Sequence, residues 1–286
     1  MGAARSAAPK YMKTAIIGCG HLGSILARAL AAAPLGNSTY HGRGLHLVER
    51  NPQSAQALAQ ELNASFETQA SAAVSRADVV ILAVRPQDFA QASIELAPHI
   101  EPKQLIISVL AGVRLATLAK ALPRCTQIVR AMPNLPALVH QAITALVASP
   151  QTASTSVEQA RAIFESVGKT ILLHEEAQID AVTAISGSGP GYVFYLAQAL
   201  SEAAQSIGLE AEVAETLVRE TFYGSAALWC SGPAGAQALR STLTKGGGTE
   251  AAFKAFDDEK IAERLAEGVK AAWRRYIELS GKVTTQ

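Results

Sequence analysis

Three glycines directly after the first apolar run of the sequence have the spacing of a dinucleotide-binding loop. The segment GCGHLG matches the pattern G-x-G-x-x-G through Gly18, Gly20 and Gly23. In that pattern the first glycine makes a tight turn, the second lets the backbone approach a pyrophosphate, and the third allows close helix–strand packing. The N–H groups of a following helix, which would start near His21 and Leu22, would face the phosphates. An ordinary strand-to-helix turn is the alternative interpretation.

An acidic residue ends the next apolar run. Glu49 closes the predicted strand of GLHLVERNP, at the position where an acidic side chain commonly accepts hydrogen bonds from the adenosine ribose hydroxyls. Arg50 beside it would stack on adenine or meet a 2′-phosphate. We therefore expect NADPH or NADH as the cofactor, and expect NADH to be used at least as well as NADPH. Two solvated charges in a turn are the alternative.

Three further strand ends would line the remainder of the dinucleotide. The apolar runs at 77–87, 104–112 and 126–136 contain AVRP, SVLAG and RAMPN. Ligands of open parallel sheets bind outside the carboxyl ends of the strands. The residues that we expect to contact the cofactor from these ends are Ala83, Val84, Arg85, Pro86, Ala111, Met132 and Asn134.

Two more glycine-rich segments stand in the second half of the chain. ISGSGPGY at 185–192 predicts a tight turn that opens a buried helix, because glycine permits positive φ and proline suits the first helical turn. LTKGGGTEAAF at 243–253 places three glycines before Thr249 and a new helix, an arrangement of backbone N–H groups that can cradle an anion. Structural turns between helices are the alternative for both segments.

The glycine-rich segments lie in two parts of the chain that differ in their predicted secondary structure. Apolar strands alternate with helical segments as far as residue 174, with further strands expected at 141–148 and 168–174. This order predicts a parallel sheet covered on both faces. The strand pattern then stops, and helices are expected at 176–185, 190–207, 211–231, 234–242, 249–257 and 259–280.

The predicted fold class is therefore α/β: an N-terminal Rossmann-type parallel sheet domain followed by an all-α domain. We expect a flexible extension over 1–12, the dinucleotide-binding domain over 13–174, and the helical domain over 175–286. The first residues lack the apolar core of a signal peptide.

Composition excludes several classes of function. The chain of 286 residues has 25 basic and 24 acidic residues, without the basic excess of a nucleic-acid binder. Its three cysteines are far apart, which favours a reducing compartment, here the cytoplasm, and gives no metal site. Glycine and proline interrupt the uncharged stretch 181–201, so we expect no membrane span. Only 17% of the residues are charged, which suggests that an oligomer covers part of the surface.

The sequence resembles a known family. GCGHLG, AVRP, SVLAG, RAMPNLPA, DAVTAISGSGPGYVF and LTKGGGTEAAF occur in the order found in pyrroline-5-carboxylate reductases, and the resemblance extends from residue 13 to about 280. It implies that NAD(P)H reduces the cyclic imine 1-pyrroline-5-carboxylate to L-proline, the last step of proline biosynthesis. It also implies that 175–286 is the all-α dimerisation and substrate domain of an intertwined homodimer, or of a larger ring of dimers, with the active site between the helical and coenzyme domains.

The resemblance also assigns substrate residues. It implies that Thr244, Gly247, Gly248 and Thr249 form the substrate loop, in which backbone N–H groups and the Thr244 hydroxyl hold the substrate carboxylate. The Thr249 hydroxyl would meet the ring nitrogen. Thr183, which precedes SGSGP, would also lie near the substrate, so Thr249 and Thr183 are the expected catalytic residues. The SGSGP segment would be free of side chains because helix start, nicotinamide and substrate crowd together there.

Two positions depart from the family pattern. Leu135 replaces a threonine that is common after MPN, and His140 with Gln141 stands where the family often has glycines. These departures concern the shape of a loop and not the reaction.

Two other functions remain open from the residues alone. An imine can be protonated before hydride arrives, so it does not need the proton donor of a ketone reductase. No histidine follows His174, which fits imine reduction. A 2-hydroxy-acid-type dehydrogenase would need a donor such as Lys245, and a non-catalytic dinucleotide-sensing module would need none.

Overall fold

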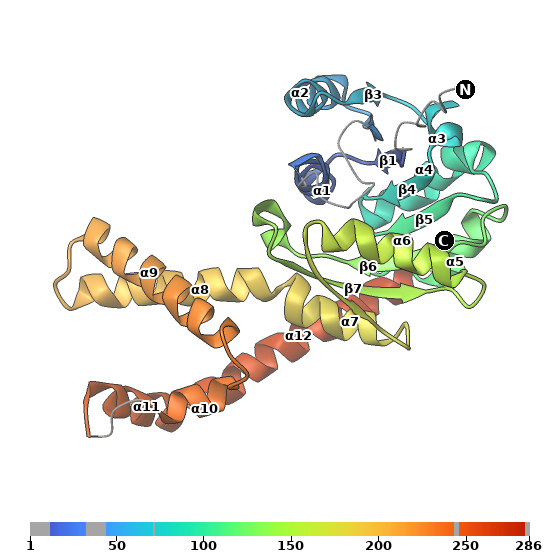
Figure 1. Cartoon of the computed structure of the whole chain (residues 1–286). Helices are drawn as coiled ribbons and strands as arrows, with labels where there is room; N and C mark the ends of the chain where they lie inside the picture. The colour runs from blue at the N-terminus through green and yellow to red at the C-terminus, as the bar shows by residue number, and fades with distance from the viewer. Residues whose placement is uncertain (1–11, 33–43, 71, 243–245, 284–286) are drawn as a thin grey trace, which may run out of the picture. The chain divides into compact units, whose positions relative to one another are not determined.

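The computed structural model describes residues 12–32, 44–70, 72–242 and 246–283. The contacts within the chain divide it into two compact units, residues 1–187 with 272–286, and residues 188–271. The first unit contains the sheet with its flanking helices, and the second contains most of the helical part that follows residue 187 (Figure 1). The boundary between these units, after residue 187, differs from the boundary after residue 174 that the sequence pattern predicts. The domain limits 13–174 and 175–286 therefore stay a prediction.

An eight-stranded sheet is the framework of the first unit. Its strands in spatial order are β3 (Ser65–Glu67), β2 (Leu45–Val48), β1 (Thr14–Ile17), β4 (Val79–Leu82), β5 (Leu105–Ser108), β6 (Ile128–Met132), β7 (Ala142–Ala148) and β8 (Gly168–Leu172). The seven expected strands are confirmed. The short strand β3 was not predicted, because SFE is too brief and too polar to stand out as an apolar run.

The sheet is parallel except at one junction. β7 pairs antiparallel with β6, with Arg130 opposite Val147, whereas the other neighbours are parallel. The expected parallel sheet is therefore confirmed, with one antiparallel pair that the sequence pattern did not indicate. The chain returns from β6 to β7 through the short 3₁₀ helix η4 (Leu135–Val139). A parallel crossover needs a dozen or more residues, and this connection is shorter.

Alternate residues of the strands belong to two apolar layers, one on each face of the sheet. Ile16 and Ile81 belong to the layer under α1 (His21–Ala32), α2 (Pro52–Leu62) and α6 (Ser154–Glu165). Ile17 and Leu82 belong to the layer under α3 (Ala72–Arg76), α4 (Phe89–Leu96), α5 (Leu115–Ala121) and α7 (Gln178–Val182). Successive strand residues point to opposite faces. The expected sheet with both faces covered is therefore confirmed (Figure 1).

The helical segments agree with the expected helices. They are α7 with the π-helical segment η5 (Thr183–Gly187), then α8 (Gly189–Ser206), α9 (Ala211–Cys230), α10 (Ala236–Ser241), α11 (Gly248–Asp258) and α12 (Ile261–Val283). The last turns of α12 belong to the first unit. There the Ser280 hydroxyl lies 3.4 Å from the carboxylate of Asp180.

The SGSGP segment is not the tight turn that was expected. The chain stays helical through η5, and only Ser188 interrupts the helical assignment before α8 begins. Gly187, Gly189 and Gly191 are not among the residues with positive φ. The segment therefore continues the helical path through a π-helical turn, whose hydrogen bonds join residues five apart, and does not reverse the chain.

The second unit exposes large apolar side chains. Helix α8 has no buried residue, and α9 buries only Ala214 and Val218. Phe194, Tyr195 and Trp229 are each more than half exposed. Apolar surface on this scale marks an interaction site in a folded chain. Among the described residues, no helix combines the length and the apolar character that crossing a bilayer requires.

Candidate functional site

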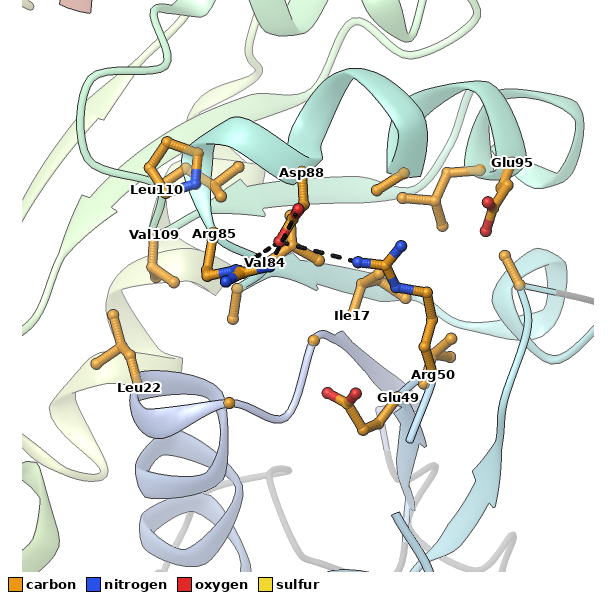
Figure 2. Close-up of a pocket in the computed structure, with 18 of the residues that line it drawn as sticks. Ile17, Leu22, Glu49, Arg50, Val84, Arg85, Asp88, Glu95, Val109 and Leu110 are labelled. Carbon is orange, nitrogen blue, oxygen red and sulfur yellow. Dashed lines mark hydrogen bonds and ion pairs between the residues drawn. The ribbon is translucent and has the colours of Figure 1, made fainter. Parts of the chain in front are cut away.

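A cavity of about 500 Å³ opens at the carboxyl ends of β1, β2, β4 and β5 (Figure 2). The strand order reverses between β1 and β4, since β2 and β3 extend to one side and β5 to the other. Ligands of open α/β sheets bind at such a switch point. The predicted cofactor residues that line the cavity are Gly18, Gly20, His21, Leu22, Glu49, Arg50, Ala83, Val84, Arg85, Pro86 and Ala111.

Three predicted cofactor residues do not line this cavity. They are Gly23, Met132 and Asn134, of which Gly23 lies inside α1. Other lining residues were not predicted: Thr68, Gln69, Ala70, Asp88, Ala92, Glu95, Leu96, Val109, Leu110, Ile17 and Val48. The first three follow the unpredicted strand β3. Val109 and Leu110 stand in the quoted segment SVLAG, and Asp88 follows AVRP by two residues, so both groups had a signal in neighbouring motifs.

The three glycines of the loop differ in what surrounds them. Gly18 has φ +89°, and its N–H donates to the Val48 carbonyl at 2.8 Å. A Cβ on Gly23 would overlap the Gly18 carbonyl oxygen, whereas a Cβ on Gly20 would meet no atom within 4 Å. Gly18 therefore makes the turn and Gly23 allows α1 to approach it. Gly20, which lines the cavity, keeps the backbone open to a ligand.

Glu49 is tied to the glycine loop by hydrogen bonds. One carboxylate oxygen accepts from the Cys19 N–H at 2.8 Å and the other from the Asn51 N–H at 3.1 Å. In Figure 2 the carboxylate of Glu49 points toward the loop after β1. Burial, and then the charge of Glu49, raise the pKa of the Cys19 thiol to about 12. Cys19 therefore stays a neutral thiol in the turn after β1.

Arg50 and Arg85 converge on Asp88 from opposite sides (Figure 2). The Arg85 Nε atom lies 2.7 Å from the Asp88 carboxylate, and the Arg50 Nη2 atom lies 3.8 Å from the same oxygen. The hydrogen bond to Asp88 raises the pKa of the Arg85 guanidinium. Both arginine side chains are about two-thirds exposed, and that of Asp88 is 23% exposed. The ion pairs are therefore within reach of a ligand in the cavity.

The side chain of Asn134 joins two backbone segments. Its Oδ1 accepts from the Ile143 N–H at 3.1 Å, and its Nδ2 donates to the Ser186 carbonyl at 3.2 Å. In a regular helix the Ser186 carbonyl would accept from the N–H of residue 190, but Pro190 has no N–H. Asn134 therefore supplies the donor that the helix lacks.

Thr183 and Gly187 lie beside Met132. Thr183 is 4% exposed, and its hydroxyl donates to the Ile179 carbonyl at 2.6 Å. A Cβ on Gly187 would stand 3.4 Å from Thr183 Cγ2 and 3.7 Å from Met132 Sδ. The end of β6 and the SGSGP segment are thus neighbours, although neither belongs to the cavity described above.

A buried charge cluster lies beneath the end of β6. Arg130 is 2% exposed, and its Nη1 lies 2.7 Å from Glu176 Oε1, which also accepts from the Leu115 N–H. Burial raises the pKa of Asp180, although the charges of Arg130 and Arg114 oppose this shift. The cluster connects β6 with the N-terminus of α5 and with α7.

The predicted substrate loop precedes α11. Gly247 has an extended conformation at the N-cap, and Gly248 and Thr249 begin the helix in an exposed position. The Gly246 N–H donates to the carboxylate of Glu250. Thr244 and Lys245 lie outside the described residues. Thr183 belongs to the first unit and Thr249 to the second.

The two departures from the family pattern have structural explanations. His140 takes φ +54°, a left-handed conformation that glycine adopts readily. Its Nδ1 lies 3.0 Å from the Ser166 carbonyl, which holds the ring in place. Leu135 packs against the apolar layer under α1. Both side chains therefore stabilise the connection between β6 and β7.

Comparisons with known proteins agree with this architecture. Residues 176–279 match the model of the pyrroline-5-carboxylate reductase dimerisation domain, and residues 13–112 match the model of the coenzyme F420-dependent NADP oxidoreductases. A pyrroline-5-carboxylate reductase of Coxiella burnetii has a similar structure, with a TM-score of 0.85 and 30% identity, over 95% of this chain and 99% of that one.

Two curated relatives extend the comparison. A pyrroline-5-carboxylate reductase of Pseudomonas aeruginosa is 41% identical over 209 residues, which cover 73% of this chain and 77% of the relative. One from Synechocystis is 34% identical over 264 residues, which cover 91% of this chain and 97% of the relative. With the cavity at the switch point and the two glycine segments of the helical part, these findings show that the chain belongs to the pyrroline-5-carboxylate reductase family.

Proposed function

We propose that the cavity at the strand ends is the coenzyme site of this reductase. The chain is an NAD(P)H-dependent oxidoreductase that reduces 1-pyrroline-5-carboxylate to L-proline, the last step of proline biosynthesis. The observation that carries the site assignment is the cavity itself, which collects the glycine loop, Glu49 and the AVRP strand end at one switch point.

The residues of the cavity fit a dinucleotide. Gly20 leaves open space where a side chain would stand, and the first N–H groups of α1 lie next to it. The pyrophosphate would bind there, stabilised by backbone N–H groups and the helix dipole. Ala83 to Pro86 and Ala111 would contact the remainder of the coenzyme from β4 and β5. When bound, the coenzyme supplies the hydride.

Glu49 favours NADH in this assignment. Its carboxylate stands at the end of β2, where two ribose hydroxyls can donate to it. A 2′-phosphate at the same place would meet a like charge in a partly desolvated pocket. We therefore infer that NADH is used at least as well as NADPH.

The substrate would bind at the loop before α11. The unpaired N–H groups at the start of a helix bind carboxylates, and the Gly246 N–H already donates to the Glu250 carboxylate. Gly247, Gly248 and Thr249 would hold the substrate carboxylate, with the Thr244 hydroxyl, and the Thr249 hydroxyl would meet the ring nitrogen.

Thr183 would have a different role from Thr249. Because its hydroxyl proton is donated to the Ile179 carbonyl, Thr183 can offer only an acceptor to a ligand. A protonated imine needs an acceptor for its N–H and no further acid, so a hydroxyl oxygen that accepts from the ring N–H would orient the ring and stabilise its charge.

The helical segments carry the dimerisation domain of the family, and the chain is a homo-oligomer. We infer that two copies cover the apolar faces of α8 and α9, on which Phe194 and Trp229 are exposed, and that such dimers can assemble into a ring. The free thiols of Cys19, Cys125 and Cys230 suit a reducing compartment, which supports the cytoplasm as the location.

An assay of NADH and NADPH oxidation tests the proposal. The purified chain is supplied with 1-pyrroline-5-carboxylate in one arm and with short 2-oxo acids in the other, and the product is identified as proline by chromatography. Turnover with the imine alone is expected. Turnover with 2-oxo acids alone would indicate a hydroxy-acid dehydrogenase, and coenzyme binding without turnover would indicate a sensing module.

A further inference from the structure

The cavity contains an acidic residue that no sequence motif predicted. Asp88 ends the 3₁₀ helix η2 (Pro86–Asp88), which begins at the proline of the AVRP segment. Its carboxylate receives Arg85 through two hydrogen bonds, of 2.7 Å and 3.4 Å, and Arg50 at 3.8 Å. Asp88 therefore binds both arginines of the cavity at once (Figure 2).

One of these arginines stands where a 2′-phosphate would be recognised. Arg50 follows Glu49 directly at the end of β2, the strand end that receives the adenosine ribose in folds of this type. An arginine nearby accommodates the phosphate in enzymes that use NADP. Here the Arg50 guanidinium points at the Asp88 carboxylate, which belongs to the segment after another strand, β4.

The charge balance of the cavity also disfavours a phosphate. Its described lining residues include three acids, Glu49, Asp88 and Glu95, against Arg50 and Arg85. A phosphomonoester carries nearly two negative charges at neutral pH. It would have to displace Asp88 from Arg50 or bind beside it, and like charges in close contact reduce affinity.

We propose that Asp88 is a specificity-determining residue, which weakens the binding of a 2′-phosphorylated coenzyme because it occupies Arg50 and Arg85. This inference rests on the proposed coenzyme site. It adds a second determinant to Glu49, and this determinant acts through the arginines and not through the ribose hydroxyls. A residue that only stabilised η2 would affect NADH and NADPH alike, since both share the remainder of the molecule.

The test compares Asp88→Asn with Glu95→Gln in the full-length protein. Both changes remove one carboxylate from the same cavity, but Glu95 has the amide of Gln91 as its partner at 3.0 Å and not an arginine. Dissociation constants for NADH and NADPH are measured by fluorescence titration, and kcat/KM is measured with each coenzyme. Thermal melting verifies that each variant is folded.

Asp88→Asn should strengthen NADPH binding about five- to tenfold relative to NADH, as expected for the loss of a close like charge at a partly exposed site. Glu95→Gln should change this ratio less than about twofold. The double variant Asp88→Asn with Arg50→Met should lose most of the gain, because the arginine beside the expected ribose position is then absent and only Arg85 remains.

Three results would overturn the inference: an unchanged ratio in Asp88→Asn, an equal gain in Glu95→Gln, or a gain that persists without Arg50. The first would show that Asp88 holds the arginines in place without competing for them, and the second that only total charge matters. If the wild type bound neither coenzyme, the proposed coenzyme site itself would be refuted, and this inference with it.

Discussion

Gly20 and Gly23 should respond in opposite ways to the same added methyl group. A Cβ on Gly23 would stand 3.0 Å from the Gly18 carbonyl carbon, closer still to its oxygen, and 3.3 Å from the Ala83 Cβ. A Cβ on Gly20 would meet nothing within 4 Å. Gly23→Ala should therefore damage the fold, whereas Gly20→Ala should damage only ligand binding.

The size of the first effect follows from what must move. The atoms that a Cβ on Gly23 overlaps belong to the backbone, so α1 must shift away from the loop. Overpacking of this kind costs about 1–3 kcal/mol, and we expect the upper part of this range because no flexible side chain can yield. The better helix propensity of alanine offsets about 1 kcal/mol. A net loss of about 2 kcal/mol lowers Tm by roughly 4–8 °C in a chain of this size.

The second variant separates binding from stability. Gly20→Ala should leave Tm unchanged or slightly higher, since alanine restricts the unfolded chain more than glycine. Its methyl group would stand at the edge of the cavity where the pyrophosphate approaches, so NADH affinity should fall at least tenfold, which is about 1.4 kcal/mol. Differential scanning fluorimetry with and without NADH measures both quantities. Normal NADH affinity in Gly20→Ala would refute the assignment of the loop.

Four further changes test other parts of the molecule. Glu49→Ser should shift preference toward NADPH, measured as the ratio of kcat/KM values; a wild type that prefers NADPH tenfold or more, about 1.4 kcal/mol, would show that Arg50 governs the pocket. Thr249→Val should keep Tm but lower kcat/KM for the imine by about 1–3 kcal/mol, the scale of a lost hydrogen bond to a buried group, and an unchanged value would remove Thr249 from the site. Because burial raises the pKa of Asp180, its contribution to stability is complete below the unfolded pKa of about 3.9 and is lost as pH rises through the folded value. The Tm of wild type relative to Asp180→Asn should therefore fall as pH increases above about 4, and a constant difference would contradict the cause given for the shift. Asn134→Asp keeps the acceptor but loses the donor to Ser186, so chemical denaturation should show a loss of about 1–3 kcal/mol, whereas the same change at an exposed helix cap should have little effect.

Most of the sheet could be predicted because its buried strands are continuous apolar runs. Ile16 and Ile81 stand in such runs, and each following glycine or proline marks the strand end. The strand β3 could not be found in this way, because an edge strand covered on one side needs few apolar residues. The direction of β7 was predictable in principle, since its connection to β6 is too short for a crossover helix.

The residues of the candidate site also differ in whether the local sequence alone could predict them. The places of Gly20 and Glu49 at the cavity were predictable because each stands at a fixed distance from a strand end, which the sequence displays. Asp88 was not, because its importance depends on a partner from another strand end. Arg50 and Asp88 are 38 residues apart in sequence, and only the order of β2, β1 and β4 brings them to one cavity.

Asn134 and the SGSGP segment show what folding adds to two motifs that were interpreted separately. Each motif was expected to face ligands on its own account, and whether Asn134 also contacts the coenzyme stays a prediction. In the structure, Pro190 deprives the Ser186 carbonyl of its helical donor, and the Asn134 amide, 52 residues earlier, provides one. This hydrogen bond is partly buried, and a carbonyl without a donor costs up to about 1–3 kcal/mol when it is fully buried. The proline in one motif therefore creates the need for the asparagine in the other, and the pair fixes the end of β6 against the helix that leads into the dimerisation domain.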